Sequence, residues 1–152
     1  MTALRIRTGI AGDLPALREV FRRASLSNAG DKTALLAHPE ALLLADAGTT
    51  DGRTRVAIMV DRVVGFATML KAGGVLELED LFVDPDWMRR GIGRQLVRDC
   101  LTIAREGRID VTANPHSVPF YRAVGFAGRT DVATPFGFGT RMHMMVTAHP
   151  GP

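Results

Sequence analysis

Apolar and polar positions along the chain switch between the two-residue period of a strand and the 3.6-residue period of a helix. Residues Leu4–Arg7 alternate, which predicts a first strand. Apolar residues at helical spacing follow, with Asp13 as the expected N-cap and Pro15 in the first turn. A second helix is expected over Thr33–Ala45, where Pro39 bends or splits it. The chain therefore opens with a strand and two helical segments.

The middle of the chain has the pattern of β-strands followed by a helix. Arg55–Val60 and Arg62–Leu70 are separated by little more than Asp61, so they predict an antiparallel hairpin. After a glycine turn, Val75–Val83 predicts another strand. Gly91–Arg105 then carries apolar residues at helical spacing. The expected apolar stripe of this helix consists of Ile92, Leu96, Cys100 and Ile103.

The last third of the chain predicts three strands and one short helix. Ile109–Ala113 is the first strand, and Ser117–Val124 is a helix that Gly125 ends as its C-cap. Phe126–Asp131 and Thr140–Val146 are the closing strands.

This order of elements predicts an α/β fold with a mixed sheet. The strand, helix and strand between Val75 and Ala113 form one βαβ unit. At 152 residues, the chain is expected to form a single domain over residues 1–152.

Composition indicates an ordinary folded protein, with 46% hydrophobic and 23% charged residues. The one cysteine, Cys100, excludes an internal disulfide and is interpreted as a buried small residue. Residues 1–13 lack a signal-like apolar run, and no stretch approaches the roughly 18 residues of a membrane span. We therefore expect a cytoplasmic protein without membrane contact. No metal site is expected, since no metal-ligand spacing links His38, His116, His143 and His149.

Positive charge gathers in one part of the chain. The net charge is +3, and arginine provides almost all of the positive charge. Between Met88 and Arg108, only Asp99 and Glu106 oppose six arginines. Arginine binds phosphate with two parallel hydrogen bonds, so a phosphorylated ligand is one interpretation, and a solvated basic face is the other. The six are Arg89, Arg90, Arg94, Arg98, Arg105 and Arg108.

The segment Leu81–Leu96 is the most informative in the chain. A strand leads through a short loop into a helix that opens with Gly91-Ile92-Gly93. Glycines let the backbone approach a ligand, and the first turn of a helix presents unpaired N–H groups, so this arrangement suits a pyrophosphate. A P-loop is excluded because Arg94 and Gln95 follow the glycines. A dinucleotide-binding fingerprint is excluded as well, because Leu96 stands where that fingerprint needs a third small residue. A bare Gly-x-Gly is also typical of a structural turn, which is the alternative interpretation.

Two motifs together resemble the GNAT superfamily of N-acetyltransferases. The first is Met88–Gly93, similar to the family's Arg/Gln-x-x-Gly-x-Gly/Ala turn, although methionine replaces the usual first residue. The second is Ala113–Phe126, which resembles the family's segment ending Phe-Tyr-x-x-x-Gly-Phe. The opening residues, from Ile6 through Leu17, are also similar, and the resemblance spans about Leu4–Val146. It implies a GNAT-like acyltransferase fold, with a mostly antiparallel twisted sheet, helices on both faces, and acetyl-CoA as cosubstrate.

The resemblance also assigns roles to particular residues. The backbone N–H near Val83 would hold the oxyanion, and Asn114 would bond the pantetheine arm. Tyr121, the only tyrosine, matches the family's general acid for the leaving thiolate. The alternatives are that Leu81 and Val83 only pack the core, that Asn114 is a turn residue before Pro115, and that Tyr121 is a buried helix aromatic. The expected cofactor contacts are Leu81, Phe82, Val83, Met88, Arg89, Arg90, Gly91, Ile92, Gly93, Arg94, Asn114 and Tyr121.

A base for the attacking amine is expected on the strand Val75–Val83. An alkyl amine is mostly protonated at neutral pH and must lose a proton before it attacks. Glu77 and Glu79 share one face of this strand, and Glu79 is preferred because it is nearer the motif. Two solvated carboxylates are the alternative.

The sequence thus indicates an N-acetyltransferase whose acceptor is a primary amine of a small molecule, a peptide or a protein lysine. The acceptor pocket is expected from residues 24–44 and 134–139. A non-catalytic module that binds coenzyme A is the alternative. Nucleic-acid binding is the third option, raised by a pI near 9.7 but unsupported by any recognition motif. The resemblance leaves a homodimer open.

Overall fold

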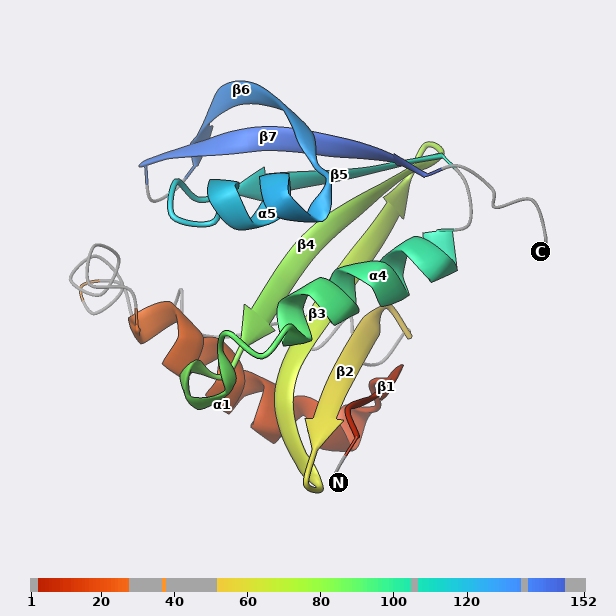
Figure 1. Cartoon of the computed structure of the whole chain (residues 1–152), viewed down its shortest axis with the longest axis vertical. Helices are drawn as coiled ribbons and strands as arrows, with labels where there is room; N and C mark the ends of the chain where they lie inside the picture. The colour runs from red at the N-terminus through yellow and green to blue at the C-terminus, as the bar shows by residue number, and fades with distance from the viewer. Residues whose placement is uncertain (1–2, 28–36, 38–51, 105–106, 135–136, 147–152) are drawn as a thin grey trace. The chain divides into compact units, whose positions relative to one another are not determined.

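The computed structural model describes residues 3–27, 37, 52–104, 107–134 and 137–146, whose strands form a mixed seven-stranded sheet in the order β1-β2-β3-β4-β5-β7-β6 (Figure 1). Only β4 and β5 pair in parallel among the described strand pairs, which confirms the predicted mostly antiparallel sheet. The expected helix Thr33–Ala45 falls outside the described residues, apart from position 37. The strands are β1 (Arg5–Thr8), β2 (Thr54–Met59), β3 (Arg62–Ala72), β4 (Val75–Val83), β5 (Gly107–Ala113), β6 (Ala127–Thr134) and β7 (Gly137–Val146).

Within the described residues, three helices and two short 3-10 helices join these strands. The predicted boundaries agree with the structure to within a few residues, and the predicted strand over Val75–Val83 is β4. Among the described residues, no helix is both long and apolar enough to cross a membrane. The helices are α1 (Leu14–Leu26), α4 (Ile92–Ala104) and α5 (Val118–Val124), and the 3-10 helices are η1 (Ala11–Asp13) and η3 (Pro85–Trp87).

The chain forms two compact units. The first consists of Met1–Thr68 and Asp80–Leu96, and the second of Met69–Glu79 and Val97–Pro152. The single domain over residues 1–152 stays a prediction.

In the first unit, β1, β2 and β3 form an antiparallel sheet that packs against α1. The β2–β3 connection is Val60-Asp61, with φ of 50° and 57°, which suits the tight hairpin that the sequence predicts. The core beneath α1 includes Leu17 and Val20 from the helix and Phe66 from β3. The residue before Phe66 is Gly65, which points to the opposite face, where a Cβ would lie 3.4 Å from Ile92 and Leu96 of α4. Helices therefore cover both faces of β3, as predicted.

Asp13 stands at the N-cap position of α1 without capping it. No hydrogen bond joins its side chain to the helix. Its carboxylate instead accepts two hydrogen bonds from Arg7 of β1, both 2.8 Å, and one of 2.8 Å from the Ile10 N–H. The Arg7 guanidinium holds the pKa of this carboxyl below its usual range. Asp13 thus connects β1 to the start of α1. The prediction that its side chain caps the helix is wrong.

In the second unit, β5 pairs in parallel with the start of β4 and antiparallel with β7. Figure 1 shows α5 lying along β5 and β7. Gly125 ends α5 with φ of 126°, as its predicted C-cap role requires. Ile109 and Val111 of β5 and Met142 of β7 are buried.

The apolar stripe of α4 differs from the prediction at one end. Ile92, Leu96 and Cys100 are buried as expected. Ile103 is 44% exposed, whereas Val97 is buried. Ile103 lies in the last turn of the helix, where its predicted place in the buried stripe is wrong.

Candidate functional site

The turn from β4 into α4 is built around Asp84. Its backbone N–H donates to the Val64 carbonyl at 2.8 Å, which holds the end of β4 to β3. Its side chain accepts from the Asp86 N–H at 2.9 Å, and its carbonyl accepts from the Trp87 N–H at 2.8 Å. An aspartate followed by proline is a favourable start for a short helix, which explains η3 at this point.

Backbone geometry after η3 leaves a set of N–H groups available to a ligand. Arg89 and Gly91 have φ of 63° and 78°, so the chain reverses twice before α4 begins. The first helical bond runs from the Gln95 N–H to the Gly91 carbonyl at 3.0 Å. The N–H groups of Ile92 and Gly93 precede that bond and have no acceptor within the helix. A Cβ at Gly91 would meet no protein atom within 4 Å, so this surface is open to an anion.

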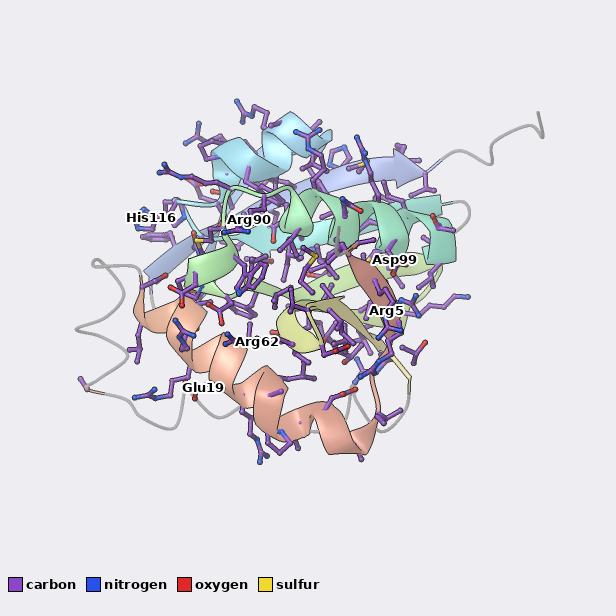
Figure 2. All side chains as sticks on the ribbon, turned by 60° about the horizontal axis from the view of Figure 1, so that its bottom comes forward. Arg5, Glu19, Arg62, Arg90, Asp99 and His116 are labelled. Atoms are coloured by element: carbon purple, nitrogen blue, oxygen red, sulfur yellow. The ribbon has the colours of Figure 1, made fainter. Side chains whose placement is uncertain are left out.

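Side chains add positive charge at the same turn. Arg89, Arg90 and Arg94 are exposed, and Met88 is 46% exposed. The Arg90 guanidinium carbon lies 4.7 Å from the centroid of the Trp87 ring, a cation–π contact that holds this arginine on the turn (Figure 2 labels Arg90). The predicted cofactor contacts from Met88 to Arg94 therefore all lie in the first unit, where the side chain of Ile92 is buried.

A second arginine contact braces this turn from α1. Arg23 Nη1 donates to Asp84 Oδ2 at 3.0 Å, and Arg23 Nη2 donates to Asp86 Oδ2 at 2.9 Å. The Asp84 side chain is 5% exposed and that of Asp86 is 72% exposed. Hydrogen bonding to Arg23 lowers the pKa of Asp86. Sequence reasoning missed this contact, because it read Asp84-Pro85-Asp86 only as the end of a strand.

The last residues of β4, Leu81–Val83, lead into the turn and also contribute to the packing of the first unit. The Phe82 ring makes an edge contact with Phe21 of α1, at 4.9 Å between centroids, and a tilted contact with Phe66, at 5.7 Å. Leu81 and Val83 are partly buried. The side chain of Phe82 thus packs on the core.

In the second unit, Tyr121 is mostly buried on α5, with 7% of its surface exposed. Its ring makes edge contacts with Phe120 and Phe126, at 5.2 and 5.4 Å between centroids. Asn114 is exposed, and its Oδ1 accepts from the Ser117 N–H at 3.0 Å. Asn114 therefore makes the contact expected of a turn residue before Pro115, which was the alternative to a role in binding. Its amide NH2 group is not used in that bond.

Glu77 lies in an ion cluster formed by three strands. Arg141 of β7 donates from both terminal nitrogens to the two Glu77 oxygens, and Nη2 also reaches Asp110 Oδ2 at 3.2 Å. Arg108 donates to the same Asp110 carboxylate at 2.7 and 3.1 Å. The hydrogen bond with Glu77 raises the pKa of Arg141 above its usual range. Glu79 is exposed.

The predicted residues thus fall into two sets. The contacts expected from Leu81 to Arg94 lie in the first unit, and the second unit holds Glu77, Glu79, Asn114 and Tyr121. Sequence reasoning missed Arg141 and Asp110, whose only signal was their place on the polar side of their strands.

The predicted acceptor region lies mostly outside the described residues. Residues 24–27 and 37 are described from the stretch 24–44, and residue 134 and residues 137–139 from the stretch 134–139. Phe138 is 74% exposed. It borders a hollow of about 490 Å³ between α5 and the strands β6 and β7, to which Arg122 and Asp131 also contribute.

Cys100 and two of the four histidines, His116 and His143, lie within the described residues. Cys100 is 1% exposed, which confirms its predicted burial. His38 and His149 lie outside the described residues, within which no group of three potential metal-ligating side chains occurs.

Parts of the chain are similar to known N-acetyltransferases. The chain is 41% identical over 75 residues to the peptidyl-lysine N-acetyltransferase YjaB of Escherichia coli K12, covering 47% of this chain and 48% of that protein. It is 37% identical over 71 residues to the N-alpha-acetyltransferase RimI of Mycobacterium tuberculosis, covering 42% of this chain and 45% of that protein. The chain thus spans about half the length of these curated relatives.

The fold comparison covers nearly the entire chain. The crystal structure of the PaiA N-acetyltransferase from Thermoplasma acidophilum in complex with coenzyme A matches with a TM-score of 0.69 and 18% identity, over 94% of this chain and 99% of that one. At this identity the match establishes the fold alone. Residues 15–126 match the Acetyltransferase (GNAT) family. The chain therefore belongs to the GNAT family of acetyltransferases.

Proposed function

We propose that this protein transfers the acetyl group of acetyl-CoA to a primary amine. The observation that carries the proposal is the β4–α4 turn, where N–H groups without a helical acceptor lie beside an open glycine and exposed arginines. Membership of an acetyltransferase family supports the same ligand. Acetyl-CoA supplies the thioester carbon that the amine attacks.

The turn would bind the pyrophosphate of acetyl-CoA mainly through its backbone. The N–H groups of Ile92 and Gly93 would donate to phosphate oxygens, and Arg89 and Arg94 would add charge. Binding through the backbone would account for Met88 at the position of the family's usual Arg or Gln, because a backbone N–H donor does not depend on the side chain. The Val83 N–H and the Asn114 amide are the proposed donors to the oxyanion and the pantetheine arm.

Tyr121 is the proposed proton donor to the departing thiolate. Its ring is held between Phe120 and Phe126, so its hydroxyl is restricted to a narrow range of directions. A proton given from Tyr121 Oη to the sulfur, as its bond to the acetyl carbon breaks, would let coenzyme A leave as the neutral thiol.

Glu79 is the proposed base, ahead of Glu77. Both oxygens of Glu77 accept hydrogen bonds from Arg141, and the Glu77 side chain is partly buried. Glu79 lies two residues further along β4, toward Leu81 and Val83, and is exposed. It would take the amine proton directly or through one water.

The acceptor class is a separate proposal. The two curated relatives are named for acetylation of peptidyl lysine and of an N-terminal amine. We therefore propose a polypeptide amine as the acceptor, with small-molecule amines as the class to test against it.

Calorimetric titration with acetyl-CoA, using NAD and ATP as controls, tests the proposal directly. Selective binding in the micromolar range is the expected result. A panel of lysine peptides, free N-terminal peptides and small amines then shows which class releases coenzyme A. Binding without release for every amine would favour the non-catalytic module, and no binding to folded protein would overturn the proposed function.

A further inference from the structure

We infer that Arg23 is a positioning residue for coenzyme A binding, because it fixes the β4–α4 turn through Asp84 and Asp86. The inference rests on the proposed function, which places the pyrophosphate at this turn. Arg23 itself lies on α1 and is not among the residues of the turn.

The contacts of Arg23 reach the N-cap of η3, Asp84, and the middle residue of η3, Asp86. Nη1 bonds Asp84, whose backbone closes on Val64 and Trp87, and Nη2 bonds Asp86. Asp84 is buried, so its position is fixed by the sheet, whereas Asp86 is exposed. The Arg23 guanidinium therefore links the buried Asp84 to the exposed Asp86. Because the guanidinium is planar, it limits how the two carboxylates can be oriented relative to each other.

A ring contact beside this pair strengthens the link to α1. Phe21 of α1 packs edge-on against Phe82 of β4, two residues before Asp84. Figure 1 shows the segment around η3 (green) beside α1 (orange), which agrees with these contacts. The first turn of α4 begins only five residues after η3, so the direction of η3 determines where the N–H groups of Ile92 and Gly93 point.

Arg23 also neutralises two carboxylates next to a surface that must receive a pyrophosphate. Without Arg23, Asp84 and Asp86 would carry negative charge toward the same region, and Arg62 would be left as a cation acting on Asp86 (Figure 2 labels Arg62). The loss of Arg23 therefore misdirects the turn and repels the ligand, and both effects reduce the fraction of molecules competent to bind.

The test compares the affinity of Arg23→Ala and Arg22→Ala for coenzyme A by calorimetry. Arg22 is the matched control, since it is the adjacent arginine, its side chain is 57% exposed, and its only described ion pair is a 4.0 Å contact with Glu19. Arg23→Ala should weaken binding about 10-fold if the competent fraction falls to about a tenth, whereas Arg22→Ala should bind as the wild type does. In the acetylation assay, KM for acetyl-CoA should rise while kcat stays unchanged.

Two further measurements separate positioning from simple stability and charge. The thermal midpoint of the ligand-free Arg23→Ala protein should lie below that of Arg22→Ala, because the buried Asp84 carboxylate loses its donor. The affinities are therefore compared at a temperature at which both alanine variants are fully folded. Arg23→Lys keeps the charge but loses the fork, so it should bind about threefold more weakly than the wild type. Arg23→Lys also replaces Arg23→Ala if the alanine variant does not fold.

The outcomes are distinct. Wild-type affinity in a folded Arg23→Ala or Arg23→Lys protein overturns the inference and leaves the proposed function intact. Full recovery of Arg23→Ala affinity in 1 M salt would also overturn it, because screened repulsion would then account for the whole effect. A wild-type protein that does not bind coenzyme A overturns both.

Discussion

Each of the two units contains one arginine that bonds two carboxylates. Arg23 connects a helix to Asp84 and Asp86 of a turn, and Arg141 connects Glu77 and Asp110 on neighbouring strands. The first network shapes a backbone surface that would bind a ligand. The second network engages a side chain that the sequence offered as a base. The same chemical motif thus supports a proposed binding site in one region and bonds a candidate base in the other.

Tyr121→Phe should give the largest effect, because it removes the proposed acid and touches neither network. We expect kcat to fall by about 10²–10⁴, the range of general acid catalysis, with unchanged affinity for acetyl-CoA. Steady-state rates with the amine found in the acceptor screen, alongside calorimetry, measure the two quantities. An unaltered kcat would remove Tyr121 from the mechanism.

Glu79→Gln and Glu77→Gln test whether the Arg141 network determines which carboxylate acts. Glu79→Gln should lower kcat about 10²-fold and shift the remaining rate toward high pH, where the amine loses its proton unaided. Glu77→Gln should have a much smaller effect on kcat. The reverse order would show that Arg141 releases Glu77 during turnover.

Gly91→Asp tests the backbone character of the β4–α4 turn. It should weaken coenzyme A binding about 10- to 100-fold by placing a side chain and a negative charge on the open surface. Gly52→Asp is the control, since φ is 79° at Gly52 and 78° at Gly91 and neither Cβ would meet a protein atom within 4 Å. Equal affinity of the two variants for coenzyme A would mean that the ligand binds elsewhere.

Arg141→Met tests the second network as a structural element. Removal of the arginine leaves Glu77 and Asp110 without their shared donor, which should lower the free energy of unfolding by about 1–2 kcal/mol. Urea unfolding measures the change, with Arg129→Met as a control at an exposed arginine of the same unit. Coenzyme A affinity should stay unchanged, and a loss like that of Arg23→Ala would break the distinction between the two networks.

Asp13→Asn should give the smallest effect, and a pH-dependent one. Because Arg7 lowers the pKa of Asp13 in the folded state, the ionised carboxylate stabilises the fold above the ordinary carboxyl pKa of about 4. This stabilisation, about 1 kcal/mol, should be lost as the pH falls through the folded pKa. Unfolding free energies of wild type and variant from pH 7 to pH 3 should therefore converge on acidification. A constant difference would show that the charge is not responsible.

Much of the fold and of the proposed cofactor turn follows from local sequence. Gly91 and Gly125 stand where the backbone takes positive φ, and Asp84-Pro85 starts η3, because such residues favour these conformations whatever surrounds them. Strand and helix periods likewise predicted β4 and α4 to within a residue or two. Asp13 shows the limit, since its position was predicted but its partner, Arg7, was not.

Only the tertiary structure decided which charges meet. Arg141 and Glu77 are 64 positions apart, and Arg23 and Asp84 are 61 apart, so no local pattern connects them. Strand order and register bring the first pair together, and the packing of α1 on the sheet brings the second. The sequence by itself determined where the backbone turns, because that depends on each residue's own conformational preferences. Which carboxylates are held by arginine depends on the whole fold, because their partners come from distant parts of the chain.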